Sequence, residues 1–430
     1  MKHYIIIFAL ALVGLSSCGI YGQFESPVAE ADTVQVPTYD QVFTDPNLQQ
    51  LIATALMNNL DLKVAHENVN QANACLLGAK LAYIPSIYAS PSATYSNQTG
   101  QGVWSYGLAQ ASWEIDIFGR LTNKMWAARA SQKQSVDYEQ AARSELIAAV
   151  AQAYYLLITL DASIEANDSA EATWKHMVEV QREMKNVGLA DEAAVAQFEG
   201  SYHASRVNGE ELRLQRIQVL NAFVPLLGTA NVENIKRSKL VDVTGIMPAL
   251  ATVNLKAVKT RPDVRAAEHQ LEIAFYNKNY SVANCCPSIT LTGSLGLLSG
   301  GLLYSAVGSL LQPIFNSGRN IQEVRVAKAQ KEAAQYSYSQ ALLKAGTEVN
   351  DALAARDTYI RETEMHTSRV LAMERAFDAT NTKMHLGMGT YLEVLTAENA
   401  LIEATFALID NRGAILQSQV DLYLAIGGGK

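Results

Sequence analysis

Residues 120 to 187 contain neither proline nor glycine. Proline breaks a helix because it lacks a backbone N–H and clashes with the preceding turn, and glycine weakens one. A run without either residue therefore favours one uninterrupted helix, which at 1.5 Å per residue would be roughly 100 Å long. Helices in globular proteins average about three turns. The chain is thus predicted to be mainly α, with helices of exceptional length.

Apolar residues within this run follow the spacing of coiled coils. Their steps alternate between four and three residues, which keeps one apolar seam facing a partner helix. The seam residues are Leu146, Val150, Ala153, Leu157, Leu160 and Ile164, with similar seams at Leu342, Ala345, Val349 and Ala352 and at Val370, Met373 and Phe377. The alternative is the core stripe of an ordinary helical bundle, which the length of the run disfavours. We therefore expect long paired helices.

The chain also repeats itself. Five short matches occur in the same order and at nearly constant spacing in the two halves, which is hard to obtain by chance. They are Leu60-Asp61-Leu62 with Pro262-Asp263-Val264, Pro85-Ser86-Ile87 with Pro287-Ser288-Ile289, Ile117-Phe118-Gly119-Arg120 with Ile314-Phe315 and Gly318-Arg319, Val187-Gly188-Leu189 with Leu386-Gly387-Met388, and Leu227-Gly228 with Ile426-Gly427. We predict two tandem copies, residues 46–228 and 250–430, joined by a connector at 229–249 that Pro225 and Pro248 flank.

Each copy also contains a segment in which the helical pattern stops, residues 85–120 and residues 287–319. In the second of these, polar and apolar residues alternate from Ser288 to Leu295, which predicts a strand with water on one side. Gly100-Gln101-Gly102 and Gly300-Gly301 indicate turns. Each copy is therefore expected to supply two strands, a duplicated unit of strand pair and long helix.

The first strand pair is rich in aromatic residues, as the girdle of a membrane β-barrel is. These residues are Tyr88, Tyr95, Trp104, Tyr106 and Trp113. Four strands cannot close a barrel, and open sheet edges are not tolerated in lipid. We therefore expect the chain to assemble with copies of itself. Three copies would supply twelve strands, which lies within the known size range of such barrels.

The first residues have the pattern of a secretory signal. A basic head, Met1-Lys2-His3, precedes an apolar stretch from Tyr4 to Leu15 that is too short to span a bilayer. It ends in Leu15-Ser16-Ser17-Cys18-Gly19, which resembles a bacterial lipobox. We predict a lipoprotein signal at 1–17, a lipid on Cys18 and an N-terminal linker at 18–45. The alternative is an ordinary signal peptide in which Cys18 lies near the cleavage point by chance.

Taken together, these patterns resemble the TolC-like outer-membrane efflux proteins, in particular the lipoprotein branch that works with resistance-nodulation-division pumps. The resemblance covers nearly all of the mature chain. It is carried by Trp113-Glu114-Ile115-Asp116-Ile117-Phe118-Gly119-Arg120, Arg261-Pro262-Asp263-Val264, Pro313-Ile314-Phe315 with Gly318-Arg319, Tyr391-Leu392-Glu393-Val394-Leu395, and the ending Leu422-Tyr423 with Gly427-Gly428-Gly429.

The resemblance implies a homotrimer in which a twelve-stranded outer-membrane β-barrel continues as a twelve-helix periplasmic α-barrel. It implies a passive exit duct for small molecules, partnered by a periplasmic adaptor (membrane fusion protein) and an inner-membrane resistance-nodulation-division transporter. It implies no cofactor beyond the lipid on Cys18. An exit duct for a protein-secreting (type I) transporter is the runner-up, since a similar tunnel can serve either pump.

The resemblance also places a gate at the periplasmic end, where the long helices turn back. Tyr391, Leu392, Glu393 and Thr396 occupy the stretch in which the family constricts its tunnel, often with aspartate rings. Three symmetry-related Glu393 side chains would form a charged ring, and Leu392 an apolar plug. Thr396 stands where the family frequently has aspartate. The alternative is that these residues only pack a helical hairpin.

The two turns at this end are candidate docking tips for the adaptor. They contain Gly188, Asp191, Glu192, Gly387 and Gly389. Acidic residues directly after a turn also stabilise the positive end of a helix, so capping explains Asp191 and Glu192 equally well.

Other classes are disfavoured. A net charge of -8 argues against nucleic acid binding. Three cysteines remain after Cys18, namely Cys75, Cys285 and Cys286, and no histidine pair has metal-ligand spacing, so no metal site is expected. The sequence has no nucleophile elbow or phosphate loop, which argues against an enzyme. A periplasmic adaptor is the nearest rival, but it should carry one hairpin rather than two copies that each begin with strands.

Overall fold

The computed structural model describes residues 22–26, 36–96, 103–230, 235–243, 255–298, 301–313 and 316–428. The chain forms two compact units. Unit 1 consists of Met1–Glu30, Ala65–Glu139 and Pro262–Leu342, and unit 2 of Ala31–Val64, Gln140–Arg261 and Leu343–Lys430. Both copies of the predicted repeat contribute to each unit.

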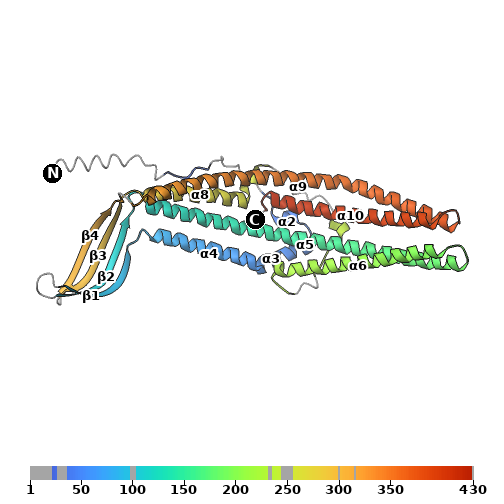
Figure 1. Ribbon diagram of the computed structural model, residues 1–430, viewed down its shortest axis with the longest axis horizontal. Coiled ribbons are helices and arrows are strands. Elements are labelled where there is room, and N and C mark those ends of the chain that lie inside the picture. Colours follow the sequence, from blue (N-terminus) through green and yellow to red (C-terminus); the bar gives the residue numbers. More distant parts are fainter. Residues whose placement is uncertain are drawn as a thin grey trace. The chain divides into compact units, whose positions relative to one another are not determined.

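Unit 1 contains a four-stranded antiparallel sheet (Figure 1). Its strands are β1 (Ser86–Ser96), β2 (Val103–Ile115), β3 (Ser288–Leu298) and β4 (Gly301–Leu311), in the order β1-β2-β3-β4. Strands β2 and β3 join the two copies, with Trp113 opposite Leu291. The prediction of two strand pairs is confirmed, and within the described residues the outer edges of β1 and β4 have no strand partner. The turn predicted at 100–102 and Gly300 lie outside the described residues.

Strand β1 contains a proline, Pro91. Proline cannot donate a ladder hydrogen bond, so it is confined to edge strands and bulges. Both conditions hold here, because β1 is an edge strand and its register with β2 shifts between Ala89 and Ser92.

The change from strand β2 to helix α5 (Arg120–Asn186) explains the motif that precedes the helix. Gly119 has a φ of 73°, in the left-handed region that favours glycine. The Arg120 guanidinium donates to both carboxylate oxygens of Glu114, with Nε to Oε1 at 2.8 Å. Asp116 accepts from the backbone N–H of Thr122 at 2.7 Å and from its hydroxyl at 2.6 Å, and thereby caps the helix. The acidic residues of this motif are therefore structural.

The helices match in length between the copies. Helices α5 and α9 (Arg319–His385) each have 67 residues, and α4 (Leu60–Leu81) and α8 (Pro262–Ala283) each have 22. Helices α6 (Glu192–Leu227) and α10 (Tyr391–Ala425) have 36 and 35. The predicted long helix and the duplicated unit are confirmed. Pro225, which flanks the predicted connector, lies inside the last turn of α6.

The core of unit 2 follows the predicted seams. Val150 and Leu157 on α5 are fully buried, and Ala345 and Val349 on α9 are 1% exposed. Four short elements complete the described part: α2 (Tyr39–Val42), α3 (Pro46–Asn58), α7 (Leu240–Val243) and η3 (Leu255–Thr260). Helix α5 includes a stretch apolar enough for a membrane span, but 56% of that stretch is buried in the protein, as expected of a core helix.

Candidate functional site

The residues predicted as gate and docking tips lie at the ends of two helical hairpins in unit 2. We call α5 from residue 140 with α6 the first hairpin, and α9 from residue 343 with α10 the second hairpin. Glu192 begins α6 and Tyr391 begins α10, so positions in the two hairpins correspond at an offset of 199 residues.

Both hairpins turn with the same backbone geometry. Gly188 has a φ of 78° and its N–H donates to the Lys185 carbonyl at 3.0 Å, while the Leu189 N–H donates to the Met184 carbonyl at 2.8 Å. In the second hairpin Gly387 has a φ of 69°, and its N–H donates to the Met384 carbonyl at 3.0 Å. The Met388 N–H donates to the Lys383 carbonyl at 2.9 Å. This pair of bonds is the Schellman motif, which requires a left-handed residue at its turn. The two glycines are therefore explained by backbone geometry.

The remaining tip residues cap the returning helices. Asp191 accepts from the Ala194 N–H at 2.8 Å, and Glu192 forms an ion pair with Lys185. In the second hairpin Thr390 takes the capping role of Asp191, and its hydroxyl accepts from the Glu393 N–H at 3.3 Å. Helix capping thus accounts for both tips, and docking stays a prediction.

Gly389 is constrained in a different way from Gly188 and Gly387. A Cβ at this position would lie 3.1 Å from both the Lys383 Cβ and the Met384 backbone nitrogen. The close approach of the two helices at this turn therefore favours the smallest residue.

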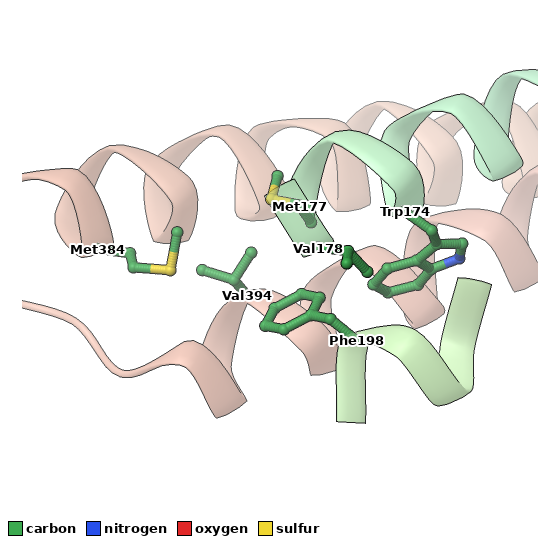
Figure 2. Packing of buried hydrophobic residues seen from close by; sticks show 6 residues of the cluster. All are labelled: Trp174, Met177, Val178, Phe198, Met384 and Val394. Carbon is green, nitrogen blue, oxygen red and sulfur yellow. The ribbon is translucent and has the colours of Figure 1, made fainter. Parts of the chain in front are cut away.

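An apolar cluster joins the two hairpins near their tips (Figure 2). We call it the tip core; it consists of Trp174, Met177 and Val178 of α5, Phe198 of α6, Met384 of α9 and Val394 of α10. The ring centroids of Trp174 and Phe198 are 6.0 Å apart. Because all four helices contribute, the packing of each hairpin depends on the other.

The four predicted gate residues divide into two groups. Tyr391 is half-buried and packs against the tip core. Leu392 is 56% exposed, and Glu393 and Thr396 are also exposed. The Thr396 hydroxyl donates to the Leu392 carbonyl at 2.8 Å, within the same helix. Three of the four side chains are therefore exposed, and their role in a gate stays a prediction.

Sequence reasoning missed Glu398, which lies on the buried side of α10. Its side chain is 4% exposed, and its Oε2 has no hydrogen-bond partner in the described part of the chain. Burial raises the pKa of Glu398 to about 7. A glutamate in a helix is usually a surface residue, so composition gives no warning. The signal in the sequence is the comparison of the two copies, because Asn381 stands where the first copy has Arg182.

The sheet in unit 1 carries the predicted aromatic residues on exposed positions. Tyr95 lies opposite Trp104, with ring centroids 5.3 Å apart, and Trp104 stacks on Tyr106 at 6.3 Å. Trp104 is 51% exposed and Tyr95 56% exposed. Their rings form a continuous exposed group. The predicted lipidation site, Cys18, lies outside the described residues.

Comparison with known proteins matches the family described as outer membrane efflux protein, over residues 51–229 and 255–428. The probable efflux pump outer membrane protein TtgC of Pseudomonas putida is 29% identical over all of this chain and 96% of its own length. The cation efflux system protein CusC of Escherichia coli is 26% identical over 98% of this chain and 97% of its own length.

Solved structures agree with these matches. A membrane protein from Pseudomonas aeruginosa superposes with a TM-score of 0.87 at 26% identity, covering 95% of this chain and 96% of that one. The open state of the MtrE outer membrane channel of Neisseria gonorrhoeae superposes with a TM-score of 0.82 at 26% identity, covering 95% and 97%. These coverages leave neither copy of the repeat unmatched.

Proposed function

The chain belongs to the outer membrane efflux protein family, whose members are transport ducts rather than enzymes, and from this premise we propose that it is the gated exit duct of a tripartite efflux system. The observation that carries the proposal is the duplicated unit itself. Each copy supplies two membrane-type strands and a 67-residue helix, so one chain holds both a piece of a pore and a piece of a tunnel.

The proposed assembly is a homotrimer. The free edges of β1 and β4, as the described residues leave them, carry unpaired N–H and C=O groups, which are too costly to expose to lipid. In a ring of copies, one neighbour can pair the β1 edge and the other neighbour can pair the β4 edge. Three copies would close a twelve-stranded barrel, within the range of outer-membrane barrels.

The proposed anchor is a lipid on Cys18, which would hold the assembly in the outer membrane. Acyl chains contribute roughly 0.8 kcal/mol per buried methylene, so several chains anchor firmly. We expect Cys18→Ser to abolish incorporation of labelled fatty acid. Labelling that persists in this variant would contradict the lipobox assignment.

The proposed gate is the exposed group at the start of α10. Leu392, Glu393 and Thr396 project from its first two turns, away from the tip core. In a trimer each would be present three times around the axis. Leu392 would exclude water from the closed tunnel, while the Glu393 ring would favour cations and repel itself when crowded.

The proposed partners are a periplasmic adaptor and an inner-membrane resistance-nodulation-division transporter. The relatives are named as efflux pump and cation efflux components, which favours small molecules over secreted proteins as cargo. The hairpin tips expose apolar side chains that suit a protein partner, Val187 and Leu189 on the first and Leu386 and Met388 on the second.

The test is one preparation of purified protein, measured for mass in detergent and for conductance in planar bilayers. We expect a trimer with rare, small openings, because the gate is closed without its partners. A monomer without conductance would contradict the proposal. A trimer that is permanently open would contradict the gate but not the duct.

A further inference from the structure

The two hairpins differ at one pair of corresponding positions. In the first hairpin Arg182 and Glu199 form an ion pair with Nη2 to Oε1 at 2.5 Å, and their side chains are 58% and 37% exposed. In the second hairpin the corresponding residues are Asn381 and Glu398. The arginine has become an asparagine, and the glutamate is 4% exposed. The second carboxyl has therefore lost its cation and much of its solvent.

Both side chains of the altered pair have an unsatisfied oxygen. Asn381 Oδ1 and Glu398 Oε2 are buried atoms without a hydrogen-bond partner among the described residues. An ionised carboxyl can only accept hydrogen bonds, so the buried Glu398 Oε2 would carry negative charge without a donor from the described residues. A protonated carboxyl is neutral and does not bury a charge. The arrangement therefore fits the neutral acid better than the carboxylate.

Within the described part of the chain, no charged group compensates for the burial of Glu398. Val394, in the first turns of α10, packs in the tip core with apolar side chains from α5, α6 and α9, and the partly buried residues packed against this core include Tyr202 and Tyr391. The amide of Gln181 donates to the Met384 sulfur at 3.4 Å. Burial is the one cause of the raised pKa of Glu398, and no neighbouring charge contributes to it.

We propose that Glu398 is a proton-operated latch on the second hairpin. The neutral acid lets the start of α10 pack onto the tip core, and the carboxylate loosens that packing. The effect on the channel rests on the proposed function, because Leu392, Glu393 and Thr396 lie on the same first turns of α10. Loosening these turns would displace the proposed gate.

The direction follows from the raised pKa. An acid whose pKa is higher in the packed state stabilises that state most fully below the ordinary glutamate pKa, near 4.5. The stabilisation is lost as the pH rises through about 7. One pKa unit is a tenfold change in equilibrium, so the packing equilibrium should shift by roughly three-hundredfold between these limits. Acid should keep the hairpin packed, and mild alkali should loosen it.

Trp174 provides a local reporter because it lies in the tip core and is 2% exposed. The trimer would be labelled with 5-fluorotryptophan and its fluorine resonance followed from pH 5 to 9, with Trp174→Phe to assign the signal among four tryptophans. We expect the Trp174 resonance to titrate with a midpoint near 7. Glu398→Gln, which mimics the neutral acid, should remove the transition and keep the low-pH signal.

Two further variants make the comparison between hairpins direct. Asn381→Arg gives Glu398 the partner that Glu199 has, so it should favour the carboxylate throughout this range and also remove the transition. Glu199→Gln is the matched control in the first hairpin, and it should leave the transition unchanged. A Trp174 transition that persists in Glu398→Gln, or is absent from the unmodified protein, would overturn the latch.

Conductance separates the latch from the proposed gate. In planar bilayers the unmodified trimer should open more often at pH 8 than at pH 5.5, and Glu398→Gln should not, although both retain Glu393. If the Trp174 resonance titrates while the openings do not change, the latch is upheld and the position of the gate in the proposed function is wrong.

Discussion

Five ion pairs join α5 to α6 in the first hairpin, whereas the corresponding positions of the second hairpin carry a neutral or apolar residue on at least one side. The pairs are Arg182–Glu199, Lys185–Glu192, Arg206–Glu171, Arg213–Asp168 and Arg216–Asp161. Their counterparts are Asn381 with Glu398, Met384 with Tyr391, Thr405 with Val370, Arg412 with Thr367, and Ile415 with Ile360. The reverse case is Arg369–Glu403, which corresponds to Ala170 and Ala204.

The difference concerns what holds each hairpin closed. Exposed ion pairs contribute about 0 to 1 kcal/mol each, but they do not depend on keeping water out. Apolar contacts such as those of Met384 and Val394 contribute more, and they are lost when water enters the tip core. Both hairpins would lose apolar contacts if the tip core loosened, but the first would keep its ion pairs, so it is expected to open less than the second.

Two valines at corresponding positions give the largest expected effect. Val195 is 5% exposed and Val394 is fully buried, so Val→Ala at either position should cost roughly 2 kcal/mol. In the second hairpin this would raise the local opening equilibrium by roughly a factor of 30. Hydrogen exchange should show faster exchange at the start of α10 for Val394→Ala than at the start of α6 for Val195→Ala. Equal rates would remove the difference between the hairpins.

The proposed gate gives the next largest effect. Leu392 and Glu393 correspond to Ala193 and Ala194, so the double change Leu392→Ala with Glu393→Ala gives the second tip the side chains of the first. We expect a several-fold rise in leak conductance through the closed channel, because an apolar constriction would be lost. Bilayer recordings at one fixed pH would measure it. An unchanged leak would exclude both residues from the gate.

The two turns should respond equally to the loss of their glycines, because they have the same backbone geometry. Alanine at Gly188 or at Gly387 would have to adopt a left-handed φ, at a cost of roughly 1 kcal/mol in either hairpin. The expected result is a similar increase in hydrogen exchange at residues 184–189 and 383–388. A large effect in only one hairpin would show that the two Schellman motifs are not equivalent.

The ion pairs give the smallest effect. Arg182→Ala should destabilise the first hairpin by about 0.5 kcal/mol at low salt, because the pair is mostly exposed. The difference from the unmodified protein should shrink in about 0.5 M salt, where exposed charges are screened. Exchange at residues 178–186 would measure it. A cost that salt does not change would point to packing by the arginine stem instead.

Much of the fold could be predicted because it depends on local and periodic signals. The helix expected over 120–187 ends one residue earlier, and the seam through Val150 and Leu157 is buried as the spacing required. The two strand pairs followed from alternation and from turn glycines. Tertiary context decides what the pattern leaves open. Pro91 is tolerated because β1 is an edge strand with a bulge at this position.

The sequence was enough to predict where the candidate site lies, but not which of its side chains are buried. The turn glycines at 188 and 387 marked both tips, and the returning helices begin within a few residues of them. The burial of Glu398 could not be foreseen from α10 alone, because burial depends on which other helices pack against that face of α10. A position-by-position comparison of the two copies would have pointed to Glu398. Its counterpart Glu199 pairs with Arg182, whereas the second copy has Asn381 at the position of that arginine.

The equal lengths of α5 and α9 imply a strong asymmetry between kinds of mutation. Each residue turns a helix by about 100° and advances it by 1.5 Å, so deleting one residue from the middle of α5 would rotate every later side chain away from its partner. Val150 and the tip core could not both stay buried after such a change. A substitution disturbs the packing around one residue, whereas a deletion rotates all later residues of the helix relative to the helices they pack against. These helices should therefore accept length changes only in steps of about seven residues, the period at which the seam returns to register.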